Sequence, residues 1–205
     1  MTDSRRAATL PVSFFSQPTE QVARELLGAV VVSRIGGMRT AGRIVETEAY
    51  LGHTDPASHG YASRRHARNA SLYGPAGTWY VYLSYGVHWC CNLVCEGKGL
   101  GGAVLLRALE PLAGLDAMMT RRRTTTRALL CSGPGRLTQA LGITLALDGT
   151  AMRSSDVTVQ RGETVEAADI VASARIGITK AADWPRRWLL PAAAGRRAAG
   201  RHRDG

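Results

Sequence analysis

The stretch RIVETEAY, residues 43–50, carries two carboxylates inside an otherwise apolar run. Its pattern predicts a strand, and side chains two apart on a strand share a face. Glu46, Glu48 and Tyr50 therefore lie on one face. Burying a carboxylate without a partner costs several kcal/mol, so we expect at least one glutamate to have a partner or a chemical task. For an isolated Glu-x-Glu, ion pairing with arginines at a sheet edge is the ordinary explanation.

Aromatic residues gather in a predicted β-hairpin over residues 77–95. Tyr80 and Tyr82 share a face of its first strand, and Tyr85 falls at the tip beside Gly86. Core packing is the ordinary explanation for aromatics at period two, but it explains a tyrosine at an exposed tip less well. Such a residue fits a wedge that enters between bases and kinks a duplex.

His59 lies in a long segment, residues 52–77, with few periodic apolar residues. A loop of that length in a compact domain is usually functional. Alone, His59 is as consistent with a hydrogen-bonded loop residue as with a catalytic one. Together, however, an aromatic pocket, a carboxylate and a wedge favour an enzyme that extrudes a base from duplex DNA and stacks it on aromatic rings.

The charge of the chain supports a polyanionic partner. The 205 residues carry a net charge of +10, and only Lys98 and Lys180 are lysines. Such an excess favours nucleic acid or an acidic membrane surface, and arginine offers a rigid fork for phosphate, although a GC-rich genome produces the same arginine bias. No apolar run approaches the ~18 residues of a membrane span, and no signal peptide is evident. We expect no membrane association and a cytoplasmic, nucleoid-associated protein.

The cysteines predict no metal site. Three of the four, Cys90, Cys91 and Cys95, lie within six residues, but no Cys-x-x-Cys spacing occurs and the adjacent pair points to opposite faces of a strand. Buried free thiols are the better interpretation, with Cys131 as the fourth. We expect no metal and no cofactor.

The predicted elements give one α+β domain over residues 11–190, between a flexible arm (1–10) and a basic, disordered tail (191–205). The predicted helices begin with Thr19 as N-cap and end at Gly28, run from Pro111 to Arg122, and run from Pro134 to Leu141. The predicted strands cover residues 29–35, 39–50, 78–84, 87–95, 102–107 and parts of 156–178.

The chain resembles the alkyladenine (3-methyladenine) DNA glycosylase family from about Val12 to about Trp184. The resemblance rests on long ordered motifs with compatible spacing: GRIVETEAYLG, the Arg68-Asn69 pair, GTWYVYLSYGVHWCCN, VLLRALEPLAG, LCSGPGRLTQALGI and ARIGI. It implies a mixed or antiparallel curved sheet with flanking helices and a protruding β-hairpin that enters DNA.

The resemblance also implies a role for each matching residue. Glu48 matches the glutamate that activates water, and Arg107 the arginine that helps to hold that water. The residues that match the base pocket are Tyr50, His59, Tyr82 and Asn92, and the asparagine discriminates against the 2-amino group of guanine. Tyr85 matches the side chain that fills the gap in the duplex. The residues expected to contact the DNA backbone are Arg68, Asn69 and His88.

These roles predict a monofunctional base-excision-repair glycosylase, without metal or lyase activity, that acts as a monomer on duplex DNA containing alkylated purines. Deaminated or etheno purines are a further implied possibility. Lyase chemistry normally needs an amine nucleophile, and no lysine lies near the motif. Two alternatives remain: a non-catalytic module that binds damaged nucleic acid, and a carbohydrate hydrolase that uses Glu46 and Glu48 as an acid/base pair.

Two segments depart from the family pattern. Relatives usually have a proline before Arg68-Asn69, where this chain has Ala67. Relatives also close with an aromatic segment and a Gly-Ser-Pro-x-Val-Ser motif, whereas this chain runs PRRWLLPAAAGRR after Trp184. The C-terminal wall of the pocket is therefore the part that the resemblance predicts least.

Overall fold

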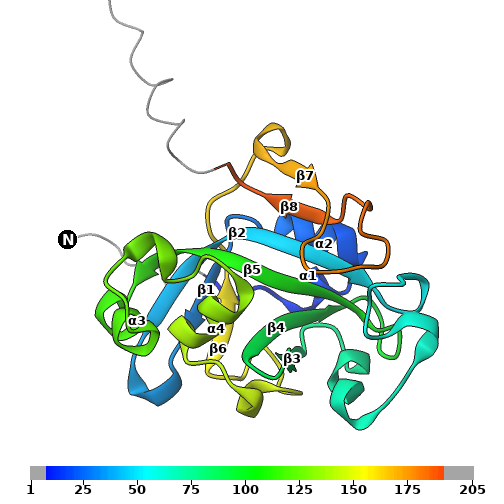
Figure 1. Ribbon diagram of the computed structural model, residues 1–205, viewed down its shortest axis with the longest axis horizontal. Coiled ribbons are helices and arrows are strands. Elements are labelled where there is room, and N and C mark those ends of the chain that lie inside the picture. The colour runs from blue at the N-terminus through cyan, green and yellow to red at the C-terminus, as the bar shows by residue number, and fades with distance from the viewer. Residues whose placement is uncertain (1–7, 192–205) are drawn as a thin grey trace, which may run out of the picture.

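One antiparallel sheet organises the chain in the computed structural model, which describes residues 8–191 (Figure 1). The strands are β1 (Val30–Ser33), β2 (Thr40–Leu51), β3 (Trp79–Ser84), β4 (His88–Cys95), β5 (Gly102–Ala113), β6 (Val157–Gln160), β7 (Val171–Ser173) and β8 (Arg187–Leu189). Their order is β3-β4-β5-β2-β1-β6, with β8 paired to β2 and β7 paired to β8. This arrangement confirms a single α+β domain, and the sheet is antiparallel throughout its named strand pairs.

Short helices pack on the sheet. They are α1 (Val12–Phe15), α2 (Thr19–Glu25), α3 (Leu115–Arg122) and α4 (Pro134–Leu141). Helix α2 contacts β2, whereas α4 contacts β4 and β5 and lies in front of the sheet with α3 in Figure 1. Helix α4 begins at Pro134, as expected, because the ring of proline fixes φ for a first helical turn and the missing N–H is not needed there.

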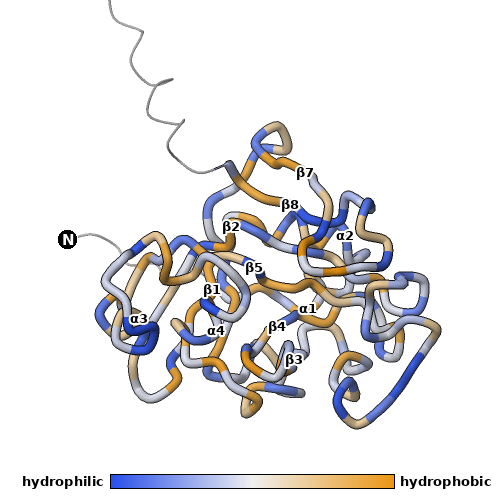
Figure 2. Tube along the Cα trace, viewed as in Figure 1, coloured by the Kyte–Doolittle hydropathy of each residue, from blue (hydrophilic) through white to orange (hydrophobic). Residues whose placement is uncertain are grey.

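Strand alternation in β2 separates the site from the core. Thr47 is fully buried, and its hydroxyl donates to the carbonyl of Ala23 in α2 at 2.7 Å. Ala49, two residues on, belongs to the apolar core. Glu46 and Glu48, which alternate with Thr47 and Ala49 along the strand, point to the other face, as the sequence predicted, and both contact Arg107. In Figure 2 hydrophobic colour is frequent in the sheet, and hydrophilic colour is frequent in the outlying loops.

Two predicted helix starts were wrong. Strand β5 continues through Pro111 to Ala113, paired along β2, so α3 begins only at Leu115. Thr19 is the first helical residue of α2 and not its cap. Its backbone N–H and its hydroxyl both donate to Glu96 Oε1, at 3.0 and 2.6 Å, so a contact distant in sequence replaces the local cap.

Both ends of the described chain contact the sheet. In the predicted arm, Leu10 is buried, and its N–H donates to the carbonyl of Val159 at 2.9 Å. At the other end, β8 forms within the divergent sequence after Trp184 and pairs with β2 at residues 46–48. The remainder of the predicted arm, residues 1–7, and most of the predicted tail, residues 192–205, lie outside the described residues.

Candidate active site

Glu48 lies at the centre of the sheet with no exposed surface. At this point β2 is flanked by β5 on one side and β8 on the other. The hydroxyl of Tyr50 donates to Glu48 Oε2 at 2.8 Å, and the backbone N–H of Ile176 donates to Oε1, also at 2.8 Å. Arg107 Nη1 lies 3.2 Å from the same Oε1. Donors on both oxygens fix the orientation of this carboxylate.

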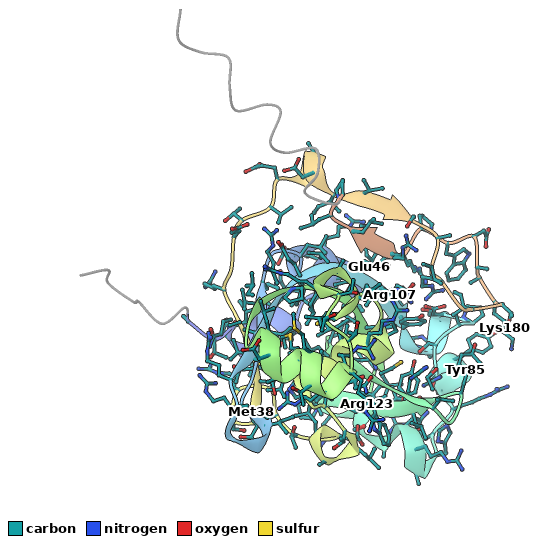
Figure 3. All side chains as sticks on the ribbon, turned by 60° about the vertical axis from the view of Figure 1, so that its left-hand side comes forward. Met38, Glu46, Tyr85, Arg107, Arg123 and Lys180 are labelled. Atoms are coloured by element: carbon teal, nitrogen blue, oxygen red, sulfur yellow. The ribbon has the colours of Figure 1, made fainter. Side chains whose placement is uncertain are left out.

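Arg107 reaches both glutamates because the β2–β5 pairing is irregular beside it. The register shifts on either side of Glu46, which leaves Val45 and Arg107 without a directly opposed residue. Bulges of this kind re-aim side chains next to active sites. Arg107 Nε donates to Glu46 Oε1 at 3.1 Å, while its Nη1 faces Glu48. Figure 3 shows Glu46 and Arg107 side by side within the domain.

Glu46 has the ion-paired place expected of it. Besides Arg107, the guanidinium of Arg187 in β8 lies 3.4 Å from Glu46 Oε1. The Glu46 side chain is 20% exposed, in contrast to Glu48 at 0%. The two carboxylates therefore share one arginine but differ in environment, and only Glu48 is sealed from solvent.

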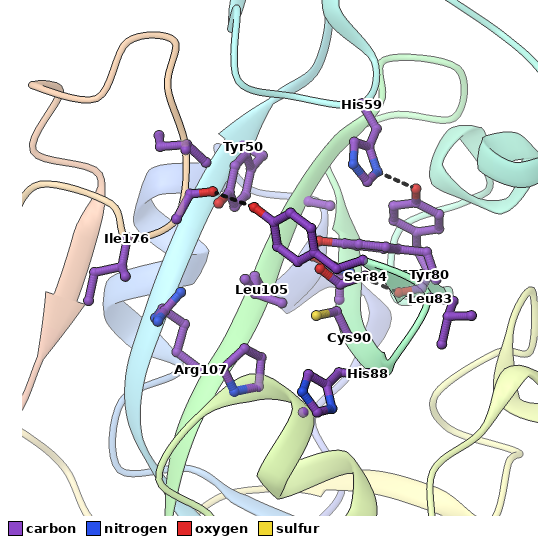
Figure 4. A pocket seen from close by; sticks show the side chains of 18 of the residues that line it. Tyr50, His59, Tyr80, Leu83, Ser84, His88, Cys90, Leu105, Arg107 and Ile176 are labelled. Carbon is purple, nitrogen blue, oxygen red and sulfur yellow. Dashed lines mark hydrogen bonds between the residues drawn. The ribbon is translucent and has the colours of Figure 1, made fainter.

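A pocket of about 850 Å³ opens over this face of the sheet. Tyr50, His59, Tyr82, Asn92 and Arg107 all contribute to its wall. In Figure 4 Tyr50 and His59 lie toward the top of the view and Arg107 toward the bottom. The structure thus brings the residues predicted for the base pocket together with Arg107, one of the two predicted catalytic residues. The other, Glu48, does not line the pocket, but it accepts a hydrogen bond from Tyr50, which does.

The aromatic wall is held by a hydrogen bond that the sequence did not suggest. His59 Nδ1 and the Tyr80 hydroxyl are 2.7 Å apart, and the His59 ring meets the Tyr82 ring edge-on with centroids 4.5 Å apart. Desolvation by the surrounding protein, with a smaller contribution from His66, lowers the pKa of His59, although the pocket leaves the side chain accessible to solvent. His59 is therefore a neutral ring at pH 7, able to stack or to hydrogen-bond.

The hydroxyls of Tyr50, Tyr80 and Tyr82 are protonated, because the pKa of each is raised. Burial raises the pKa of Tyr50, and the adjacent Glu48 raises it further. Burial likewise raises the pKa values of Tyr80 and Tyr82. Neutral phenol rings keep electron-rich faces and a proton to donate, which suits both stacking on a cation and holding a carboxylate.

Asn92 forms a buried part of the pocket wall. It is 4% exposed, and its side-chain amide donates to the backbone carbonyl of Tyr80 at 3.0 Å. This bond ties β4 to β3 and fixes the plane of the amide. Cys90, two residues before it, also lines the pocket, and burial raises the pKa of its thiol, so it is not a reactive thiolate.

The hairpin tip forms an exposed part of the pocket rim, and Tyr85 is one of the lining residues. Tyr85 and Gly86 both have positive φ, and the N–H of Val87 donates to the carbonyl of Ser84 at 3.0 Å, which closes a two-residue turn. Tyr85 is 86% exposed. Its only hydrogen bond within the described residues is a long one, 3.4 Å, from its hydroxyl to the carbonyl of Gly177. Core packing therefore does not explain this residue.

The three residues predicted to contact the DNA backbone have different surroundings. Arg68 and His88 are exposed, and His88 lies against the first turn of α4, where a Cβ on Gly135 would come within 2.7 Å of His88 Cβ. Asn69, however, is fully buried. Its amide donates to the carbonyls of His59 and Arg64 at 3.0 Å, so the structure gives it the task of shaping the His59 loop and keeps it away from the surface.

Sequence reasoning missed the residues that support this site from outside the pocket. Arg175 and Asp55 form a fully buried ion pair, and Arg175 stacks on the Tyr50 ring with its guanidinium carbon 4.7 Å from the ring centroid. Arg175 lies in the ARIGI motif, which supports the family resemblance but indicates no role for this arginine. A polar residue in a loop and an arginine 120 positions later give no local signal of their contact.

No group of three His, Cys, Asp or Glu residues within residues 8–191 is placed to hold a metal ion. The four cysteines are buried and free, as predicted. In the same part of the chain, no helix combines the length and the apolar character that crossing a membrane requires.

Comparison with known proteins shows the family of this chain. The family described as methylpurine-DNA glycosylase (MPG) matches residues 13–194. A protein of Methanoculleus marisnigri named "Putative 3-methyladenine DNA glycosylase" is 49% identical over 89% of this chain and 95% of its own length. Proteins with the same name from Rhodopseudomonas palustris and Burkholderia lata are 49% and 45% identical, over 86% and 90% of this chain and 84% and 88% of their own. The chain belongs to the methylpurine-DNA glycosylase family.

Proposed function

We propose that this protein is a monofunctional DNA glycosylase that extrudes alkylated purines from duplex DNA and hydrolyses the bond between base and sugar. The observation that carries the proposal is a fully buried carboxylate, Glu48, directly behind the wall of an aromatic pocket. Membership of the methylpurine-DNA glycosylase family supports the reaction class. Duplex DNA is the partner that this reaction requires, and we expect one copy of the chain to act on it.

In the proposed reaction the base leaves with the electron pair of its glycosidic bond. A 3- or 7-alkylated purine is already cationic, so it departs without being protonated. Tyr50 and Tyr82 offer ring faces to that cation, an attraction of about 0.5–2 kcal/mol depending on desolvation. Stacking of this kind favours the damaged base over its neutral counterpart.

Glu48 is proposed to act on the sugar side. The sugar develops oxocarbenium character as the base departs, and a nearby carboxylate stabilises that charge. The water oxygen then bonds to the anomeric carbon, and Glu48 accepts the proton. Arg107, 3.2 Å from Glu48 Oε1, is proposed to help hold the water beside the carboxylate. Asn92 is proposed to exclude guanine, and Tyr85 to fill the gap that the extruded base leaves.

The two alternative functions have less support. A carbohydrate hydrolase needs Glu46 and Glu48 as separate acid and base, yet both contact the one guanidinium of Arg107. A non-catalytic module gives no reason to bury Glu48 under three donors. The carbohydrate hydrolase also gives no reason for a tyrosine that is 86% exposed at a hairpin tip.

The test is release of free base from duplex oligonucleotides that carry 7-methylguanine, 3-methyladenine, hypoxanthine or ethenoadenine. We expect release of the cationic bases, with intact strands until alkali or heat cleaves the abasic sites. Strand cleavage without such treatment would contradict a monofunctional enzyme. Binding of a lesion duplex without release of any base would favour the binding module.

A further inference from the structure

A buried ion pair lies behind the pocket, outside the residues so far assigned to the reaction. Asp55 and Arg175 have no exposed side-chain surface. Arg175 Nη1 contacts Asp55 Oδ2, and Arg175 Nη2 donates to Oδ1 at 2.9 Å. Removing two charges from water costs several kcal/mol each, and apolar residues in their place are often no less stable. Fold stability alone is therefore a weak reason for such a pair.

The arginine end of the pair connects to both residues that would face the substrate. Arg175 Nη1 also donates to the backbone carbonyl of Ala49, between Glu48 and Tyr50, at 2.9 Å. Its guanidinium carbon lies 4.7 Å from the centroid of the Tyr50 ring. The next residue, Ile176, donates its N–H to Glu48 Oε1 at 2.8 Å. Residues 175 and 176 thus hydrogen-bond to the Glu48 carboxylate and pack against the Tyr50 ring.

The aspartate end connects to the loop that carries His59. Asp55 accepts from the N–H groups of Leu51 and Ala57, at 3.2 and 3.0 Å. Burial alone would raise the pKa of Asp55, but the hydrogen bonds from Arg175 and Ala57 hold it below its ordinary value. Asp55 is therefore an anion at neutral pH, and its partners include the end of β2 and the start of the His59 loop.

From these contacts we infer that the Asp55–Arg175 pair is a positioning device, which aligns Glu48 with its water and holds the Tyr50 ring in place for the base. The inference rests on the proposed function. Arg175 does not line the pocket, so it would act through Glu48 and Tyr50 rather than on the substrate itself. Displacements of about 1 Å in a reacting group can cost ~10²-fold in rate. Loss of the Asp55–Arg175 pair should therefore slow base release more than it weakens DNA binding.

Arg175→Lys tests this role because it keeps the cation and removes the planar fork. We expect single-turnover release of 7-methylguanine to fall about tenfold or more, with affinity for a duplex containing a non-cleavable abasic analogue within about twofold of wild type. Arg43→Lys is the matched control. Arg43 pairs with Glu110 and Glu163 at the other end of β2, outside the pocket wall, and we expect its variant to keep the wild-type rate.

A second measurement separates positioning from general stabilisation. Because Arg175 acts partly through Glu48, adding Arg175→Lys to Glu48→Gln should lower the rate by a smaller factor than adding it to the wild-type chain. A full additional loss in the double variant would overturn the inference, as would equal rate losses in the Arg175 and Arg43 variants. Unchanged release by Arg175→Lys would overturn it as well.

Failure of a variant to fold, and lack of activity in the wild-type chain, have different consequences for the inference. If Arg175→Lys does not fold, Asp55→Asn takes its place under the same expectations. If neither variant folds, the pair is a determinant of stability and the inference fails. Absence of base release by the wild-type chain would instead reject the proposed function, whereas wild-type release with unaltered variants rejects only the positioning role.

Discussion

The pocket and the hairpin tip are neighbours with opposite properties. At the pocket, the lining residue Asn92 and Glu48, which bonds to the lining residue Tyr50, are buried and hydrogen-bonded, and each comes from a strand inside the sheet. At the tip, Tyr85 and Val87 are 86% and 69% exposed. Catalysis requires atoms held near a fixed geometry, which strands with supporting contacts provide. A wedge must instead be free to enter a duplex, and an exposed two-residue turn at the end of two strands provides that freedom.

The largest effect should come from the pocket, at Glu48. Glu48→Gln keeps the shape of the side chain, since its oxygen can still accept from Ile176 and its amide can donate to the Tyr50 hydroxyl. It removes basicity and charge, so we expect base release to fall by at least ~10²-fold with near-normal lesion binding. Single-turnover release of 7-methylguanine and hypoxanthine measures this.

Glu46→Gln is the matched control for that change. Glu46 pairs with Arg107 and Arg187 at the edge of the site, so its loss should mainly lower the unfolding temperature, with a smaller effect on rate. An inactive Glu46→Gln beside an active Glu48→Gln would reverse the assignment of the base.

The next effect concerns the tip. Tyr85→Asn removes the ring and tolerates the positive φ of 50° at this position, so the turn should survive. We expect about tenfold weaker capture of a lesion duplex, an estimate based on the ~1–3 kcal/mol that one base–aromatic stack contributes. Tyr85→Phe, which keeps the ring, should bind as wild type does. The unfolding temperature of both variants should match wild type because the side chain is exposed; wild-type capture by Tyr85→Asn would remove the wedge role.

Local patterns predicted the parts of the site that depend on a single element. Strand period two placed Glu46, Glu48 and Tyr50 on one face, and the turn chemistry of Tyr85-Gly86 placed the hairpin tip. Proline in a first turn placed the start of α4. Each of these features follows from residues close together in the sequence.

Contacts between distant segments set the rest, and no local pattern encodes them. The register shifts beside Glu46 re-aim Arg107, and they arise from the pairing of two strands. The resemblance implied that Asn69, in the Arg68-Asn69 motif, contacts the DNA backbone, whereas its amide donates to two carbonyls within the loop. The Asp55–Arg175 pair joins residues 120 positions apart. Support for the site was therefore harder to predict than the site itself.

A smaller effect is expected from the hydrogen bond that orients the aromatic wall. Tyr80→Phe keeps the ring packing and leaves His59 Nδ1 without its partner at 2.7 Å. A hydrogen bond of this kind contributes about 0.5–1.5 kcal/mol, so base release should fall about two- to tenfold. Single-turnover release by Tyr80→Phe and Tyr61→Phe, a tyrosine outside the pocket wall, measures it. Equal rates for the two variants would mean that the bond does not orient His59.

The smallest effect concerns pH, where the pocket should again differ from the exposed surface. The pKa of His59 is lowered in the folded protein, chiefly by desolvation. Between that value and the ordinary value of 6.5 the unfolded chain binds more protons than the folded one. Stability is thus fully present above about pH 7 and decreases as the pH falls through 6.5 toward the folded value. The effect should be small because the ring is solvent-accessible.

Unfolding temperatures at pH 7.5 and pH 5.5 measure this decrease, and His59→Gln should reduce it. His53→Gln, at an exposed histidine of the same loop, is the matched control and should leave the decrease unchanged. Asp55 does not interfere, because its lowered pKa places the loss of its contribution at more acidic pH, below the ordinary value of 3.8. An identical decrease in wild type and His59→Gln would show that desolvation in the pocket does not hold His59 neutral.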